Sequence, residues 1–307
     1  MLDTNICGLK LKSPLILASG ILGVSYSSMK RVMDAGAGAI TSKSIGPRPR
    51  KGYKNPSIFE LFSKTFINSV GLANPGINEF QEEIEKIKQF DFPLIVSIFG
   101  DTIESYIEVA LKAENYGCDA IEINISCPHA KVSSIGINPD LTSSLVKSLK
   151  REISIPLFVK LNPNVTDITE IGLAAEKGGA DAVVAINTIA AMAIDVNTKR
   201  PILSHGSGGL SGQAIHPIAV KKVYDLYEAL HIPIIGCGGI FSWEDVIEFI
   251  LAGASAVQIG TAFYNGVQLL KTINKDLEYF LIENDYSSLS DLIGGAHKFE
   301  LQEVPDF

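Results

Sequence analysis

The feature that most constrains the fold is a regular alternation of short apolar segments with longer amphipathic ones along the whole chain. Each short segment is rich in β-branched side chains and apolar at nearly every position, which is typical of parallel strands covered on both faces. Eight such segments, each followed by a helix-like segment, predict an α/β fold of the (β/α)8 TIM barrel type. The predicted strands are residues 14–18, 39–42, 94–97, 120–123, 157–160, 182–186, 234–236 and 256–259.

Three of the intervening segments carry helix signals. Residues 102–116 place apolar side chains at helical spacing. Residues 167–177 follow the possible caps Thr166 and Asp167 and end at two glycines. Residues 242–251 start at Ser242, carry acidic side chains in the first turn and stop before Gly253. We therefore expect α-helices to connect the strands.

Some connections are longer than a strand–helix unit needs. The surplus lies at residues 44–76 and 187–213, after the second and sixth strands, and glycine-bearing residues 130–137 follow the fourth. Loops after strands build the active site of this fold, so we expect long active-site loops after strands 2, 4 and 6. Residues 1–12 predict a short N-terminal hairpin that closes the opposite end. No linker interrupts the pattern, so we expect a single barrel domain over 1–307.

Composition excludes several classes of protein. The net charge of −8 and the pI near 5.2 argue against a nucleic-acid partner. No apolar run reaches the roughly 18 residues of a membrane span, and the first residues lack the pattern of a secretory signal. The four cysteines form no CxxC pair, and the histidines have no metal-ligand spacing. The sequence therefore predicts a soluble cytoplasmic protein without a metal site.

Polar side chains follow several of the predicted strands directly. Lys43 and Lys160 end two of them, and Asn124, Cys127 and Asn187 follow two others. Because the carboxyl ends of barrel strands meet at one rim, we expect these groups to converge. Such a set suits an anionic or amide-rich ligand and a proton transfer, although a lysine at a rim also commonly extends into solvent.

Two glycine turns predict a phosphate site. Gly238-Gly239 follow the seventh strand and Gly260-Thr261 follow the eighth. In this fold a phosphate is frequently bound there, where glycines let backbone N–H groups approach it. The alternative is that they are only tight turns. Residues 206–212 are also glycine-rich, but they follow no strand, so a ligand-facing loop is favoured over a dinucleotide site.

Three asparagines, Asn68, Asn124 and Asn187, offer both donors and acceptors to the edge of a cyclic amide, although each alone is more often a turn residue. Residues 68–74 form a loop whose successive N–H groups suit a carboxylate.

Cys127 has three possible roles: base, nucleophile or inert thiol. Its polar neighbours favour function, and a free thiol with a pKa of about 8.5 is a usable base near neutrality. His129 could assist it. No oxyanion hole or orienting group accompanies the pair, which argues against a hydrolase. For Cys7 and Cys118 we expect simple burial, and for Cys237 only packing.

These residues together resemble the class 1 dihydroorotate dehydrogenases, most closely subclass 1B, over nearly the whole chain. The landmarks are residues 18–20, 43–48, 68–74, 124–128, 160–164, 186–188, 209–212, 238–239 and 260–261. The resemblance implies oxidation of dihydroorotate to orotate in de novo pyrimidine biosynthesis. Cys127 is implied as the base that takes the C5 proton, while hydride passes from C6 to N5 of FMN.

The resemblance also implies the residues that bind the two ligands. FMN would be bound by Ser19, Gly20, Lys43, Ser44, Asn124, Lys160, Ile186, Gly212, Gly238, Gly239, Gly260 and Thr261. Substrate would be bound by Lys43, Asn68, Ser69, Val70, Gly71, Leu72, Asn124, Asn187 and Thr188.

Two positions depart from the family pattern, since His129 and Ser97 stand where it usually has Asn. At both positions the sequence resembles the flavin domain of dihydropyrimidine dehydrogenase. Another flavin-dependent pyrimidine oxidoreductase is therefore the alternative. The loop at residues 68–72 and Lys43 follow the dihydroorotate pattern. Two alternatives come from other functional classes: a flavin-free phosphate-binding barrel and a non-catalytic binding subunit. The yellow colour of bound flavin would distinguish a dihydroorotate dehydrogenase from the flavin-free barrel.

Subclass 1B implies partners as well. The chain would form a homodimer and would bind an electron-transfer subunit that carries FAD and an iron–sulfur cluster and passes electrons to NAD. The chain itself has too few cysteines, in the wrong spacing, to hold that cluster.

Overall fold

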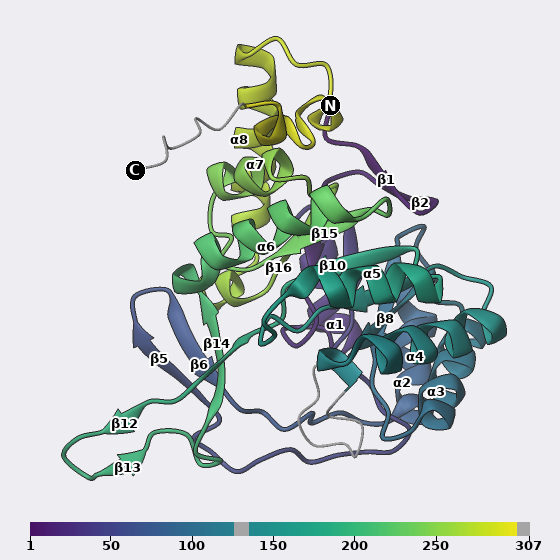
Figure 1. Ribbon diagram of the computed structural model, residues 1–307, viewed down its shortest axis with the longest axis vertical. Coiled ribbons are helices and arrows are strands. Elements are labelled where there is room, and N and C mark those ends of the chain that lie inside the picture. Colours follow the sequence, from purple (N-terminus) through teal and green to yellow (C-terminus); the bar gives the residue numbers. More distant parts are fainter. Residues whose placement is uncertain (126–134, 300–307) are drawn as a thin grey trace, which may run out of the picture.

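A closed barrel of eight parallel strands forms the centre of the computed structural model, which describes residues 1–125 and 135–299 (Figure 1). Each strand pairs with the next along the chain, and the last pairs with the first. The prediction of eight barrel strands is therefore confirmed. They are β3 (Leu15–Leu17), β4 (Ala39–Thr41), β7 (Leu94–Ile98), β8 (Ala120–Asn124), β9 (Leu157–Lys160), β10 (Ala182–Ala185), β15 (Ile234–Cys237) and β16 (Ala256–Ile259).

Within the described residues, eight α-helices surround the barrel. They are α1 (Tyr26–Asp34), α2 (Ile77–Ile87), α3 (Ile103–Asn115), α4 (Pro139–Glu152), α5 (Ile168–Gly178), α6 (His216–Ala229), α7 (Trp243–Leu251) and α8 (Leu269–Glu283). Short 3-10 helices lie at Ile135–Ile137, Gln213–Ile215, Thr261–Asn265, Leu289–Leu292 and Gly295–Lys298. No helix in this part of the chain combines the length and the apolarity that crossing a bilayer requires.

All three predicted helices are present, and α5 and α7 begin at the predicted caps Asp167 and Ser242. Thr102 and Ser242 each form a capping box, with Ser105 in α3 and with Asp245 in α7. Asp167 accepts a hydrogen bond from the N–H of Thr169 and so caps α5, which ends at a left-handed glycine. These caps satisfy N–H groups that the first turn of a helix leaves without partners.

Two apolar clusters form the core. The larger lies between the barrel and the helices, and the smaller lies inside the barrel. The smaller cluster includes Ile6, Leu9 and Leu11 from an antiparallel hairpin, β1 (Thr4–Ile6) and β2 (Leu9–Leu11). These side chains pack against residues from the starts of barrel strands, such as Ala39 and Ala120. The hairpin therefore closes the amino-terminal end of the barrel, as predicted.

The two long insertions pair with each other in a separate antiparallel sheet. Its order is β11 (Ile189–Ala191), β14 (Gly208–Gly212), β6 (Thr65–Asn68) and β5 (Ile58–Phe62). A further hairpin, β12 (Ile194–Asp195) and β13 (Arg200–Pro201), extends from it. Figure 1 shows these strands projecting from the barrel, on the side away from the β1–β2 hairpin.

The glycine-rich segment 206–212 corrects one expectation, because most of it is strand β14 rather than a loop. A Cβ at Gly208 would lie 2.2 Å from the carbonyl oxygen of Asn68, so the close pairing of β14 with β6 requires glycine there. Glycines carry no hydrophobic alternation, and the usual strand signal is therefore missing from the sequence.

Candidate active site

The amide and hydroxyl groups expected at the rim are in contact. Asn187, which follows β10, donates from Nδ2 to Oδ1 of Asn124 at 3.4 Å. Asn124, at the end of β8, donates from Nδ2 to Oγ of Ser44 at 3.2 Å. Ser44 lies 3.0 Å from Ser97 and 3.3 Å from Ser19, measured between the Oγ atoms. The carboxyl ends of five strands are therefore joined by one continuous network of polar side chains, partly buried at Ser44 and Ser97.

Lys43 lies two residues after the end of β4 and is partly buried. Among the described residues its ammonium group takes part in no ion pair, and burial lowers its pKa below the usual 10.5. A partly desolvated cation without a counterion is stabilised by any anion that binds next to it. The position thus suits an anionic ligand, as the sequence predicts.

Lys160, the last residue of β9, is 6% exposed and does not reach solvent as a rim lysine would. Its Nζ donates to Oε1 of Gln258 at 2.6 Å. Gln258 in turn donates from Nε2 to Oε2 of Glu122 at 2.6 Å and to Oγ1 of Thr41 at 3.2 Å. Gln258 and Glu122 are absent from the predicted site residues, although a polar residue inside an apolar strand segment is a usable signal.

Three glycines meet at the ends of β15 and β14. Gly238 and Gly239 have φ of 145° and 68°, and Gly212 has φ of 92°. A Cβ at Gly239 would lie 2.8 Å from the carbonyl oxygen of Gly212, so only glycine fits. The N–H groups of Gly238 and Gly239 donate to no acceptor within the described ranges. Free N–H groups on glycines are what a phosphate requires, so this turn fits the phosphate of a nucleotide cofactor.

His216 supports this turn and is likewise absent from the predicted site residues. Its Nδ1 lies 3.2 Å from the carbonyl oxygen of Gly238, and its Nε2 lies 2.8 Å from Oε2 of Glu248 on α7. The carboxylate and the carbonyl fix the imidazole ring from both sides. The neighbouring turn leads from Gly260 into the 3-10 helix that starts at Thr261.

The loop predicted to bind substrate is held by the insertion sheet. Asn68 donates from Nδ2 to the carbonyl oxygen of Gly209 at 3.1 Å. The N–H of Ser69 donates to the oxygen of Ser57 at 2.7 Å. Val70 accepts from the N–H of Tyr53 at 3.0 Å, and the ring of Tyr53 covers Gly71. The backbone of this loop is therefore fixed on both sides.

The other predicted residues occupy the same end of the barrel. Thr188 accepts at its carbonyl oxygen from Asn164 Nδ2 at 3.2 Å, and Gly209 packs against its side chain. The N–H of Ile186 donates to the oxygen of Cys237 at 2.8 Å. Leu72 and Gly20 both have positive φ, of 56° and 101°, as residues in tight turns do.

Cys127 and His129 lie outside the described residues. Of the other thiols, Cys118 is buried, as expected, and burial raises its pKa. Cys7 is only partly buried, contrary to expectation, because its hairpin closes the barrel from outside. Burial and Asp181 nevertheless raise its pKa to about 11, so it is a poor nucleophile near neutrality.

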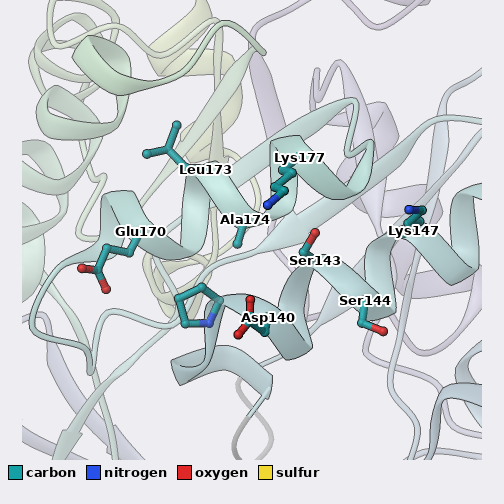
Figure 2. A pocket seen from close by; sticks show the side chains of 9 residues that line it. Asp140, Ser143, Ser144, Lys147, Glu170, Leu173, Ala174 and Lys177 are labelled. Carbon is teal, nitrogen blue, oxygen red and sulfur yellow. The ribbon is translucent and has the colours of Figure 1, made fainter.

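A separate hollow of about 440 Å³ lies between α4 and α5 (Figure 2). Most of its lining side chains are exposed, among them Asp140, Lys147, Glu170 and Lys177. None of them belongs to the rim, so this hollow is distinct from the candidate site.

Comparison with known proteins agrees with this geometry. A sequence model of the dihydroorotate dehydrogenase family matches residues 1–281. The catalytic subunit of dihydroorotate dehydrogenase B (NAD(+)) from Methanocaldococcus jannaschii is 50% identical over 305 residues, covering 97% of this chain and 99% of that protein. The same subunit from Pyrococcus abyssi is 51% identical over 303 residues, covering 97% and 100%.

A solved structure is similar as well. The crystal structure of DHODH in complex with ferulenol from Eimeria tenella superimposes with a TM-score of 0.85 at 25% identity, and covers 97% of this chain and 89% of that one. The fold, the rim and the full-length similarity lead to one conclusion: the chain belongs to the dihydroorotate dehydrogenase family of oxidoreductases.

Proposed function

We propose that this chain is the FMN-binding catalytic subunit of a subclass 1B dihydroorotate dehydrogenase, which oxidises dihydroorotate to orotate in pyrimidine biosynthesis in the cytoplasm. The observation that carries the proposal is the rim. There, two partly or fully buried lysines, three asparagines and glycine turns with free N–H groups lie at one end of a barrel in a chain of this family.

The chain's own residues divide into two groups by position. Gly238 and Gly239, with Gly212, Gly260 and Thr261 beside them, would bind the FMN phosphate through backbone N–H groups. Lys160 would contact the flavin ring from below the rim. Ser19, Gly20, Ser44 and Ile186 would line the remainder of the cofactor site. Bound FMN would supply the hydride acceptor, at its N5 atom.

Substrate recognition follows from charge and amide chemistry. Lys43 and the loop at residues 68–72 would bind the carboxylate of dihydroorotate, chiefly through the N–H groups of residues 70–72, because that loop is fixed against β14 and Tyr53. Asn124, Asn187 and Thr188 would bind the polar edges of the ring, since an amide pairs with both a donor and an acceptor. Cys127 would take the proton from C5 while hydride leaves C6.

The proposal extends to assembly. The relatives from Methanocaldococcus jannaschii and Pyrococcus abyssi are named as catalytic subunits of an NAD(+)-linked enzyme, which supports a second subunit here too. We propose a homodimer of this chain, with each copy bound to an electron-transfer subunit that carries FAD and an iron–sulfur cluster.

The test is anaerobic stopped-flow absorbance of the FMN-loaded chain, mixed with dihydroorotate or with dihydrouracil. Rapid bleaching of the flavin by dihydroorotate alone is the expected result. Bleaching by dihydrouracil alone would move the function to the alternative pyrimidine oxidoreductase and would give Ser97, which contacts Ser44, a role in that choice. A protein that shows no flavin spectrum after FMN is added would contradict the cofactor.

The same experiment tests the base. In Cys127→Ala we expect FMN to stay bound while reduction by dihydroorotate slows by at least about a hundredfold, because general-base catalysis is lost. Cys7→Ala is the matched control, since Cys7 lies on the hairpin at the other end of the barrel, and it should react at the rate of the unmodified chain. Equal rates in both variants would exclude Cys127 as the base.

A further inference from the structure

One layer below the rim, the interior of the barrel changes from apolar to polar. Thr41, Glu122, Lys160 and Gln258 each lie two residues after an apolar member of the interior cluster, on β4, β8, β9 and β16. Side chains alternate along a strand, so all four share the inward face. None is more than 6% exposed. This buried polar layer adjoins the rim that carries the candidate site.

Gln258 joins the two charged members of the layer. Its Oε1 accepts from the Lys160 ammonium, and its Nε2 donates to the Glu122 carboxylate, each at 2.6 Å. Reversing the amide would set its NH₂ against the ammonium and its oxygen against the carboxylate, so the neighbours fix its orientation. Lys160 therefore has one preferred position, which is set by Gln258.

Glu122 is the only acidic side chain among the buried residues that the structure describes. Its Oε1 has no hydrogen-bond partner there, so Gln258 is its polar anchor. A buried carboxylate is costly unless a cation lies near, and Lys160 is the cation that this network supplies. The two charges thus offset each other through one amide.

We propose that Glu122 lowers the redox potential of bound FMN by offsetting the charge of Lys160, and that Gln258 is the positioning residue that holds the lysine. The inference rests on the proposed function, in which Lys160 contacts the flavin ring. A positive charge beside that ring favours the reduced flavin, which carries more negative charge. Glu122 weakens this preference, and a lower potential eases electron transfer to a partner.

The test is a reductive titration of the FMN-loaded chain against a reference dye. Glu122→Gln removes the charge but keeps an oxygen that accepts from Gln258. We expect the equilibrium constant for flavin reduction to rise about tenfold, which is a shift of about +30 mV for a two-electron couple. The matched control is Glu152→Gln, the same change at an exposed site on α4, and it should titrate like the unmodified chain.

A second variant tests the positioning role separately. Gln258→Leu removes the acceptor that holds Lys160, so we expect the FMN dissociation constant to rise about tenfold. The FMN dissociation constant should change little in Glu122→Gln. An unchanged FMN affinity in Gln258→Leu would remove the positioning role.

Variants that fail to bind FMN also test the proposed role of Glu122. If Glu122→Gln does not hold FMN, Glu122→Met fills a similar volume while Thr41 still accepts from Gln258, and it enters the same titration. The proposal fails if whichever variant binds FMN titrates at the unmodified potential. It fails as well if neither binds FMN, because Glu122 would then be required for the site itself. Failure of the unmodified chain to bind FMN would instead overturn the proposed function.

Discussion

At the scale of single residues, Lys43 makes ligand binding depend on pH. Burial lowers its pKa below 10.5, and a bound carboxylate would raise it again. The contribution of the Lys43 ammonium to anion binding is therefore fully present below the lowered pKa. It is lost as the pH rises through that pKa. We expect the dissociation constant of orotate to increase by up to about tenfold per pH unit in that alkaline range. Isothermal titration at a series of pH values measures this.

Lys43→Met is the control for that prediction. The variant has no ammonium group, so it should bind orotate more weakly at neutral pH and show no alkaline loss of its own. Parallel pH profiles for the variant and the unmodified chain would assign the titration to another group.

At the scale of elements, strand β14 links the two insertions to the substrate side of the site. A Cβ at Gly209 would lie 2.1 Å from Oγ1 of Thr188, and the carbonyl of Gly209 also accepts from Asn68. In Gly209→Ala we expect Thr188 to be displaced, so that KM for dihydroorotate rises about tenfold while FMN content is unchanged. Steady-state kinetics and the flavin absorbance ratio measure the two effects.

The partner position on β11 supplies the control for Gly209→Ala. Ala190 pairs with Gly209 across the ladder but is exposed, so Ala190→Val adds bulk to the same pair of strands on the solvent side. It should leave KM unchanged. A rise in KM in both variants would mean that the insertion sheet as a whole is sensitive, rather than this contact.

The same elements show what sequence reasoning can reach. The barrel strands and the caps at Asp167 and Ser242 follow from local signals, namely apolar runs and side chains that bond to nearby N–H groups. The pairing of β6 with β14 joins segments about 140 residues apart, which no local pattern reveals. Polar residues after strands indicate the rim, but Glu122 and Gln258 lie within strands, where the surrounding apolar run conceals their role.

At the scale of the whole molecule, the fold depends on an interior core that the hairpin closes. Phe158 is fully buried in the cluster that joins the hairpin to the barrel strands, two residues before Lys160. Phe158→Ala would leave a cavity that eight paired strands cannot collapse to fill, so we expect a loss of about 3–5 kcal/mol in the free energy of unfolding. Urea denaturation followed by circular dichroism measures it, with Ile194→Ala as the control. Ile194 is 56% exposed on β12, and its truncation should change stability by less than about 0.5 kcal/mol. Similar midpoints for the two variants would show that the barrel interior is not the stabilising core.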